Sequence, residues 1–340
     1  QQRKSVRVVI VNWRTPLLTE RAARSLWPQL RAGDELVVVD NASASADPHD
    51  NSLAHLRRLG AKLGSAGPAR FGLVQSRRNG GFGYGVNLGA RNLRQDALVL
   101  LNSDAYALEG FVEALTAPLG HDLVEATTAR LLLEGRWRLV GDGVEAQTEP
   151  AATTQSTGSA QLRGLDGGIW VSDPNGVELI NSTGNVVDAC GNGYDRSWLA
   201  PAKQEHDSPE VFGICGGACA ISARAWRQLG GMRQDLFMYY EDTDFSYRLR
   251  RAGYRVQYVR QAQARHAHAA SSDSASEAFT TWNTRNRLRV AARYAPASVA
   301  VRALVNTGGR MLLGPQRQAR AQGLVQALAH APQDLYARIG

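Results

Sequence analysis

Three carboxylates crowd into the stretch EDTD at residues 241–244, directly after the apolar run LFMYY at 236–240. A carboxylate held against an apolar wall and away from water becomes more basic, which suits it to act as a general base. Acids at the start of a helix have a simpler role, because they satisfy free N–H groups and complement the helix dipole. The local pattern favours this capping role for Glu241 and Asp242, with proton transfer as the alternative.

The residues that follow predict the helix that carries these acids. Apolar residues recur at helical spacing over 241–252, and Gly253 is typical of the residue after a helix end. Asp244 stands four residues before Arg248, a spacing that favours an ion pair on one helix face.

Two apolar runs end in acids. The run VVVDNAS places Asp40 after one predicted strand, and LLNSDA places Asn102 and Asp104 after another. Such a carboxylate can bind the ribose or base of a nucleotide, or hold a divalent cation through its oxygens. Each acid alone is more typical of an Asx turn that closes a strand. Two strand ends on one edge of a sheet favour a shared ligand site.

The segment NGGFGYGVNLGARN, residues 79–92, carries five glycines in a strand-loop-helix context, in which NGGFGYG is the predicted loop and VNLGARNL the predicted helix. Glycines let a ligand approach the backbone closely, and a helix N-terminus favours an anion. Leu88 occupies the place of the third glycine of a dinucleotide fingerprint, and no Gly-Lys-Ser/Thr is present. A dinucleotide-binding oxidoreductase and a P-loop enzyme are therefore disfavoured, and the segment alone is a moderate signal for a nucleotide site.

Two histidines follow the strand-like YRVQYV in the segment RHAHAASS at 265–272. Residues i and i+2 of a strand point to opposite faces, so at most one of His266 and His268 can face a given site. A single imidazole at a strand end is more often a hydrogen-bonded residue than a metal ligand.

The elements that must position these groups alternate along the first hundred residues. Short apolar runs predict buried strands, and the segment 16–30 predicts a helix that begins at Pro16. The predicted strands cover residues 6–13, 34–43, 71–76 and 96–105. Strands joined by helical crossovers indicate an α/β fold with a parallel sheet and ligand chemistry at its carboxyl edge.

The second half of the chain has a different pattern. Residues 146–165 are rich in Ala, Thr, Ser and Gly and predict an exposed loop or linker, and short strands and turns follow over 166–212. Helices are predicted across 276–294 and over the last forty residues.

Composition and charge bound the possible partners. The chain is 44% hydrophobic and 21% charged, with no apolar run long enough to span a bilayer. The N-terminus leads almost directly into a strand without a signal-peptide pattern, and the three cysteines form no even framework. We therefore expect a cytoplasmic protein.

The C-terminal third is strongly basic. Residue 246 to the end carries fifteen arginines, no lysine and three acids, a net charge of +12 against −4 for the rest. This asymmetry suggests an anionic partner, such as the inner face of the cell membrane or a diphosphate-linked acceptor, and a solvated arginine-rich surface is the alternative. No nucleic-acid-binding motif accompanies the basic stretch, so nucleic acid is not expected.

Taken in order, the motifs VVIVNW, VVVDNASA, NGGFGYGVNLG, LLNSDA, CGGACAISARAWRQLGG, LFMYYEDTDFSYRLRRAGYRVQYV, RHAHAASS and RNRL resemble those of glycosyltransferase family 2. The resemblance runs from about residue 6 to 295 and is strongest to the bacterial branch that includes rhamnosyltransferases. It implies a GT-A fold, with a Rossmann-like, mostly parallel central sheet flanked by helices. By this resemblance, residues 1–295 form the GT-A domain, with a nucleotide-binding half (about 1–130) and an acceptor-binding half (about 166–295), and 296–340 form a helical C-terminal extension.

The resemblance also implies chemistry. It implies an inverting transfer from a nucleoside-diphosphate sugar, UDP- or dTDP-linked, to a saccharide, lipid-linked or small-molecule acceptor, assisted by Mg²⁺ or Mn²⁺. By position in the motifs, Asp242 is the base with Glu241 beside it, and Tyr240 and Glu241 contact the acceptor. Asp104 and His266 match the metal ligands, and Asn102 replaces the first acid of the family's D-x-D. The positions matched to nucleotide-sugar binding are Asn12, Asp40, Asn79, Gly81, Asn87, Asn102, Asp104, Gly216 and Gly217.

Two other functions remain open from the residues. A sugar nucleotidyltransferase needs its glycine-rich loop directly after the first strand, where this chain has VNWRTP. A catalytically silent nucleotide- or glycan-binding protein is suggested by Asn102. The sequence does not indicate the donor sugar, the linkage or the oligomeric state.

Overall fold

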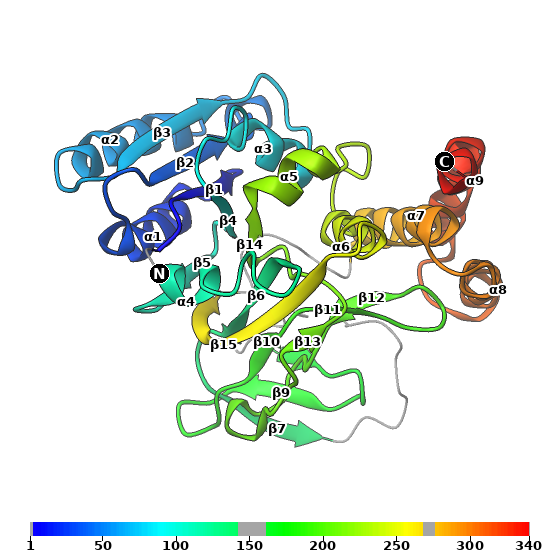
Figure 1. Cartoon of the computed structure of the whole chain (residues 1–340). Coiled ribbons are helices and arrows are strands. Elements are labelled where there is room, and N and C mark those ends of the chain that lie inside the picture. Colours follow the sequence, from blue (N-terminus) through cyan, green and yellow to red (C-terminus); the bar gives the residue numbers. More distant parts are fainter. Residues whose placement is uncertain (1–2, 142–160, 268–275, 340) are drawn as a thin grey trace.

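The computed structural model describes residues 3–141, 161–267 and 276–339 (Figure 1). His268 and residues 146–160 of the predicted linker lie outside these ranges, and residues 161–163 of that linker form a short strand. The elements of the first half are β1 (Val6–Asn12), α1 (Pro16–Leu26), β2 (Glu35–Asp40), α2 (Ser52–Gly64), β3 (Arg70–Gln75), α3 (Phe82–Gly89), β4 (Ala97–Leu101), β5 (Ala105–Ala107) and α4 (Phe111–Thr116).

The second half begins with strands and ends with helices. Its strands are β6 (Val124–Leu133), β7 (Trp137–Gly141), β8 (Gln161–Arg163), β9 (Ile169–Ser172), β10 (Ile180–Ser182), β11 (Asn185–Val187), β12 (Gly193–Asp195), β13 (Glu210–Val211), β14 (Ala218–Ser222) and β15 (Arg255–His266). Its helices are α5 (Ala223–Leu229), α6 (Glu241–Arg251), α7 (Glu277–Tyr294), α8 (Ala297–Leu313) and α9 (Arg317–Ile339).

A ten-stranded mixed sheet forms the centre of the molecule, in the order β13-β15-β6-β14-β4-β1-β2-β3, with β10 and β5 at its side. The strands β4, β1, β2 and β3 are parallel, as the alternating pattern predicts. Strand β14 runs antiparallel between β4 and β6, and β15 is parallel to β6. The parallel register places Asn12 beside Asp40 at the carboxyl edge.

Helices cover both faces of this sheet because successive strand residues alternate between them. Val8 and Ile10 belong to the core beneath α1, α2 and α4. Val9 belongs to the opposite core, with side chains from α3, α5 and α6. The sheet is thereby buried on both sides, as continuous apolar strands require.

The glycine-rich segment corrects one prediction. Helix α3 begins at Phe82, inside the stretch that the sequence predicts to be a loop. A Cβ atom on Gly85 would lie 2.6 Å from Val11, and one on Gly89 would lie 2.6 Å from Val9. These glycines therefore permit close packing of α3 on β1 rather than close approach of a ligand.

Two further parts flank the sheet (Figure 1). A small three-stranded sheet, β7-β9-β8, lies below it, and α7, α8 and α9 lie together at the C-terminal end. The C-terminal helices agree with the predicted helical extension. Within the described ranges, none of the helices is long and apolar enough to cross a membrane.

Candidate active site

A cleft with a cavity volume of about 380 Å³ opens at the carboxyl edge of β1 and β4. Its walls come from the segments after these two strands, the start of α3, the loop before β14, and the start of α6. Segments far apart in the chain thus meet at the sheet edge where an α/β fold binds its ligands.

Most of the residues that the sequence singles out line this cleft. They are Asn79, Gly81, Asn102, Asp104, Gly216, Gly217, Tyr240, Glu241, Asp242 and His266. Asn12, Asp40 and Asn87 lie behind its walls.

Asn12 and Asp40 hold the ends of β1 and β2 together. Both are buried, and the Asn12 amide Nδ2 donates to Asp40 Oδ1 at 2.9 Å. The Ser43 hydroxyl donates to the same carboxylate oxygen at 2.6 Å. The neighbouring Asn41 lines the cleft and donates to Asn79 Oδ1 at 3.0 Å. Asn12 and Asp40 thus brace the strand ends beside Asn41.

Asn87 joins α3 to the segment that leads to α6. Its side chain donates to the carbonyl of Met232 at 2.8 Å and accepts from the N–H of the same residue at 2.9 Å. The side-chain amide of Asn87 thus makes the same pair of hydrogen bonds with a backbone that a residue of a neighbouring β-strand would make. Asn87 therefore positions the wall of the cleft from behind.

Asp104 and His266 meet at the end of the central sheet. The His266 Nε2 lies 2.9 Å from Asp104 Oδ1, and its Nδ1 lies 2.6 Å from Asn181 Oδ1. Burial lowers the pKa of His266, but the charge and hydrogen bond of Asp104 outweigh it and leave that pKa raised. The structure thus places His266 at the site, whereas His268 lies outside the described residues.

Asp242 lies at the start of α6 with both carboxylate oxygens engaged. Its Oδ2 accepts from the N–H of Gly216 at 3.0 Å, and its Oδ1 accepts from the N–H of Thr243 at 2.7 Å. The second bond satisfies a free N–H of the helix, so the capping prediction holds for this residue. Burial nevertheless raises the pKa of Asp242 above its ordinary value, although these N–H groups oppose the rise.

Glu241 has a different environment from its neighbour. It is buried, and its Oε1 has no hydrogen-bond partner among the described residues. Burial raises the pKa of Glu241 to about 8, and the charge of Asp242 adds to the rise. Glu241 is therefore mostly protonated at neutral pH, with an O–H that can donate into the cleft.

A strained loop presents these two acids. Phe237, Tyr239 and Tyr240 all have positive φ angles, of 67°, 70° and 71°, a conformation that bulky residues rarely adopt. The Asn286 amide of α7 holds the loop in place by donating to the carbonyls of Leu236 at 3.0 Å, Met238 at 2.8 Å and Tyr239 at 2.9 Å.

Gly81 packs closely against this same loop. Its φ is +84°, and a Cβ atom at this position would lie only 1.7 Å from the carbonyl oxygen of Phe237. The N–H of Phe82 donates to that oxygen at 2.9 Å. Gly81 therefore allows the start of α3 and the loop before α6 to close one side of the cleft.

Sequence reasoning missed several residues of the cleft. Asp195, at the end of β12, has a pKa raised to about 6, chiefly by burial and further by the charge of Asp242. Asn181, which holds His266, and Asn283 of α7 also line the cleft. The short strands over 166–212 give no periodic signal for Asp195 or Asn181. Asn286 stood inside the quoted motif RNRL, which was the one available signal for the loop clamp.

Acidic side chains outnumber basic ones in the lining of the cleft. Its described lining includes four carboxylic acids, Asp104, Asp195, Glu241 and Asp242, and neither arginine nor lysine. An anionic ligand can enter such a site only if a cation accompanies it or the acids are protonated.

Solved structures share this architecture. A mannosyltransferase from Pyrobaculum calidifontis, in complex with GDP-Man and Mn²⁺, matches with a TM-score of 0.52 and 15% identity, over 97% of this chain and 76% of that one. GalNAc-T7, with UDP, GalNAc and Mn²⁺, matches with a TM-score of 0.58 and 14% identity, over 100% of this chain and 58% of that one. At these identities the likeness establishes the fold, which is of the GT-A type.

Sequence comparison gives two further matches. The N-acetylglucosaminyl-diphospho-decaprenol L-rhamnosyltransferase of Mycobacterium tuberculosis is 33% identical over 121 residues, which span 34% of this chain and 39% of that protein. A family model described as glycosyltransferase like family 2 matches residues 4–289. The chain therefore belongs to glycosyltransferase family 2.

Proposed function

We propose that this protein is an inverting glycosyltransferase that moves a sugar from a nucleoside-diphosphate donor to an acceptor hydroxyl. The observation that carries the proposal is the position of Asp242. It is a half-buried carboxylate of raised pKa that lines the same cleft as Asp104 and His266. One end of the cleft can bind a diphosphate, and the other can accept a proton.

The donor occupies the side of the cleft formed by the first half of the chain. Asn41, Asn79 and the backbone around Gly81 offer hydrogen-bonding groups to the nucleoside. Asn12 and Asp40 support them from behind, and the loop at Gly216 and Gly217 lies between donor and acceptor. UDP- and dTDP-linked sugars are the favoured donors, and the rhamnosyltransferase relative supports a deoxyhexose such as rhamnose.

A divalent cation, Mg²⁺ or Mn²⁺, fits the donor side. Asp104 and His266 offer one carboxylate and one imidazole, and Asn181 orients the imidazole from its other nitrogen. The lack of arginine and lysine in the described lining leaves the donor's phosphates without another counter-charge. The bound cation would stabilise the negative charge of the departing diphosphate. Asn102, which lines the cleft, supplies a neutral oxygen where relatives have an acid.

The acceptor hydroxyl approaches from the side of α6. Asp242 takes its proton as the hydroxyl oxygen bonds to the anomeric carbon, and the bond from that carbon to the diphosphate breaks with its electron pair leaving on the diphosphate. Attack opposite the leaving group inverts the configuration and needs only one base. Protonated Glu241 donates a hydrogen bond to the acceptor, and Tyr240 lies beside it. The acceptor is a saccharide, either lipid-linked, as in the name of the rhamnosyltransferase relative, or free.

A ligand panel tests the proposal. Thermal-shift measurements with UDP, dTDP and GDP, with and without Mn²⁺, should show stabilisation by one nucleoside diphosphate that depends on the cation. The matching sugar nucleotide should then be hydrolysed or transferred with inversion. Asp104→Ala should weaken the cation-dependent shift.

Two results would contradict the proposal. A protein that binds UDP or dTDP but never turns over any sugar nucleotide is not a transferase. Nucleotide binding that is insensitive to a chelator would remove the cation from the site.

A further inference from the structure

The outer surfaces of α8 and α9 are unusually apolar. Nine of the fifteen exposed large apolar side chains in the described ranges belong to these two helices. They form what we call the outer apolar face: Val301, Leu304, Val305, Leu312, Leu313, Val325, Leu328, Leu335 and Tyr336. An exposed apolar concentration of this kind marks an interaction surface.

Helical geometry places this face away from the protein. On α8, Val301, Leu304 and Val305 share one side of the helix, whereas Ala303 and Thr307, which are buried, lie on the opposite side. The same opposition holds on α9. There Val325 and Leu328 are exposed, and Ala327 and Asp334 are buried. Both helices are thus apolar on the side that no described residue covers.

The charges around this face have one sign. Between residue 296 and the end of the chain there are five arginines and one acid, Asp334. Asp334 is buried and points inward to Arg289, so it leaves no negative charge on the surface of these helices. Arg302 and Arg317 are exposed beside the apolar side chains.

We propose that α8 and α9 dock on the surface of an anionic phospholipid bilayer. Apolar side chains that insert among lipid headgroups, flanked by cations that pair with lipid phosphates, are the features of an interfacial helix. A second copy of the chain suits the face less well. Two such surfaces would bring arginines together without a carboxylate on the described parts of either helix to pair with them.

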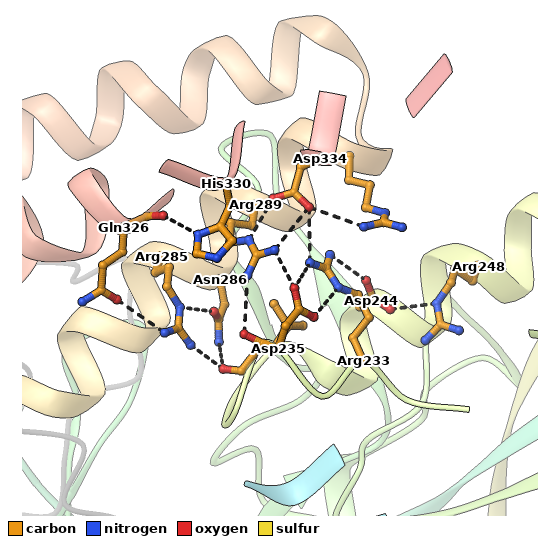
Figure 2. A network of polar contacts seen from close by, with 12 residues as sticks. Arg233, Asp235, Asp244, Arg248, Arg285, Asn286, Arg289, Gln326, His330 and Asp334 are labelled. Atoms are coloured by element: carbon orange, nitrogen blue, oxygen red, sulfur yellow. Dashed lines mark hydrogen bonds and ion pairs between the residues drawn. The ribbon is translucent and has the colours of Figure 1, made fainter. Parts of the chain in front are cut away.

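The docking helices are firmly joined to the candidate active site. Figure 2 shows Asp334 of α9 within a polar network that also contains Arg289 of α7 and Arg233 and Asp235 of the segment before α6. Helix α7 contributes Phe279 and Asn283 to the cleft. A bilayer bound by α8 and α9 would therefore lie in a fixed relation to the acceptor side of the cleft. The inference does not depend on the reaction.

Vesicle flotation tests the inference without donor or acceptor. The wild-type protein should float with phosphatidylglycerol vesicles and much less with phosphatidylcholine vesicles, and added salt should weaken the binding. Val305→Glu combined with Leu328→Glu should lower vesicle partitioning by about tenfold or more, because two inserted apolar groups become charged. Val140→Glu is the matched control, since Val140 is also exposed but lies on β7.

The alternatives have distinct outcomes. Absence of wild-type binding to either vesicle, or binding that survives the double substitution, would overturn the inference. A wild-type dimer in sedimentation that becomes a monomer in the double variant would assign the face to a second copy instead. The salt dependence of the wild-type protein decides the matter even if the double variant folds poorly.

Discussion

Two adjacent acids at the start of α6 differ because their surroundings differ. Asp242 accepts N–H bonds from Gly216 and Thr243, which favour its charged form even though burial raises its pKa. Glu241 is buried with one oxygen lacking a partner among the described residues, and its pKa rises to about 8. At neutral pH a protonated Glu241 therefore stands beside a carboxylate whose charged form is favoured by two N–H groups. This division suits one residue to receive a proton and the other to donate a hydrogen bond.

Asp242→Asn should abolish transfer while leaving nucleotide binding nearly intact. The amide keeps the shape of the side chain but cannot accept the proton, so the rate should fall by about 10²- to 10⁴-fold. In the wild-type protein, the rate should decrease as pH falls through the raised pKa of Asp242, at a higher pH than for an ordinary aspartate. A pH series of initial transfer rates, with nucleotide affinity measured in parallel, checks both effects.

The helix-cap role of Asp242 predicts a different result for the same variant. If capping were its only contribution, Asp242→Asn would lower the thermal midpoint, and activity would fall only as far as the folded fraction falls. A stably folded, inactive variant that still binds nucleotide excludes this explanation.

Residue pairs close in sequence were predictable, and pairs distant in sequence were not. The Asp244–Arg248 ion pair follows from helical spacing and is confirmed at 2.8 Å. The contact between His266 and Asn181 joins residues that are 85 positions apart, in segments without a regular pattern. Asp195 also lines the cleft from a region of short strands without a regular pattern. Local periodicity carries no information on such contacts, because long-range pairing decides them.

The loop between α5 and α6 holds backbone strain directly beside the candidate catalytic acids. Three bulky residues within 237–240 adopt positive φ, which costs free energy at each position. Asn286 of α7 offsets this cost with three hydrogen bonds to the loop carbonyls. The acids at the start of α6 follow directly after the strained residues, so their position depends on this clamp.

Asn286→Ala should therefore impair transfer more than it impairs nucleotide binding. Loss of these three hydrogen bonds, of which the one to Leu236 is buried and the other two are partly buried, should lower the free energy of unfolding by about 2–4 kcal/mol, and release of the loop should displace Asp242. Denaturant unfolding together with kcat and KM measurements would detect both effects. Asn306→Ala is a suitable control, since Asn306 on α8 is half-buried and, among the described residues, its side chain makes only a 3.5 Å hydrogen bond with Arg287. An unchanged kcat in Asn286→Ala would contradict the proposed role of the clamp.

At the scale of the whole molecule, the parallel part of the sheet was the most predictable. Continuous apolar runs separated by helical patterns lead directly to β1, β2, β3 and β4. The antiparallel insertion of β14 between β4 and β6 was not predictable, since the same apolar run suits either direction. Gly83 and Gly85 of α3 were assigned to a loop because their packing neighbours, Met232 and Val11, lie far away in sequence.

The C-terminal helices are joined to the catalytic domain by buried charges rather than by apolar packing alone. Asp334 is fully buried and accepts from Arg289 Nε at 2.8 Å, Arg233 Nη2 at 3.2 Å and Arg293 Nη1 at 3.5 Å (Figure 2). The network contains more guanidinium groups than carboxylates, so each carboxylate compensates several positive charges. Neutralising Asp334 would remove the carboxylate that three arginines share, and would leave Arg233 and Arg289 with Asp235 and Asp244 as their only counter-charges among the described residues.

Asp334→Asn should consequently destabilise the whole protein by about 3–5 kcal/mol, measured as the free energy of unfolding in denaturant. Asp173→Asn removes an equivalent charge from a surface pair with Arg138 and should leave stability unchanged. Because Arg233 and Arg289 also hold the segment before α6, Asp334→Asn should reduce transfer at temperatures where the protein remains folded. Equal stability of the two variants would show that α9 is attached by its apolar contacts alone, and that the charges at its base do not couple the C-terminal helices to the active site.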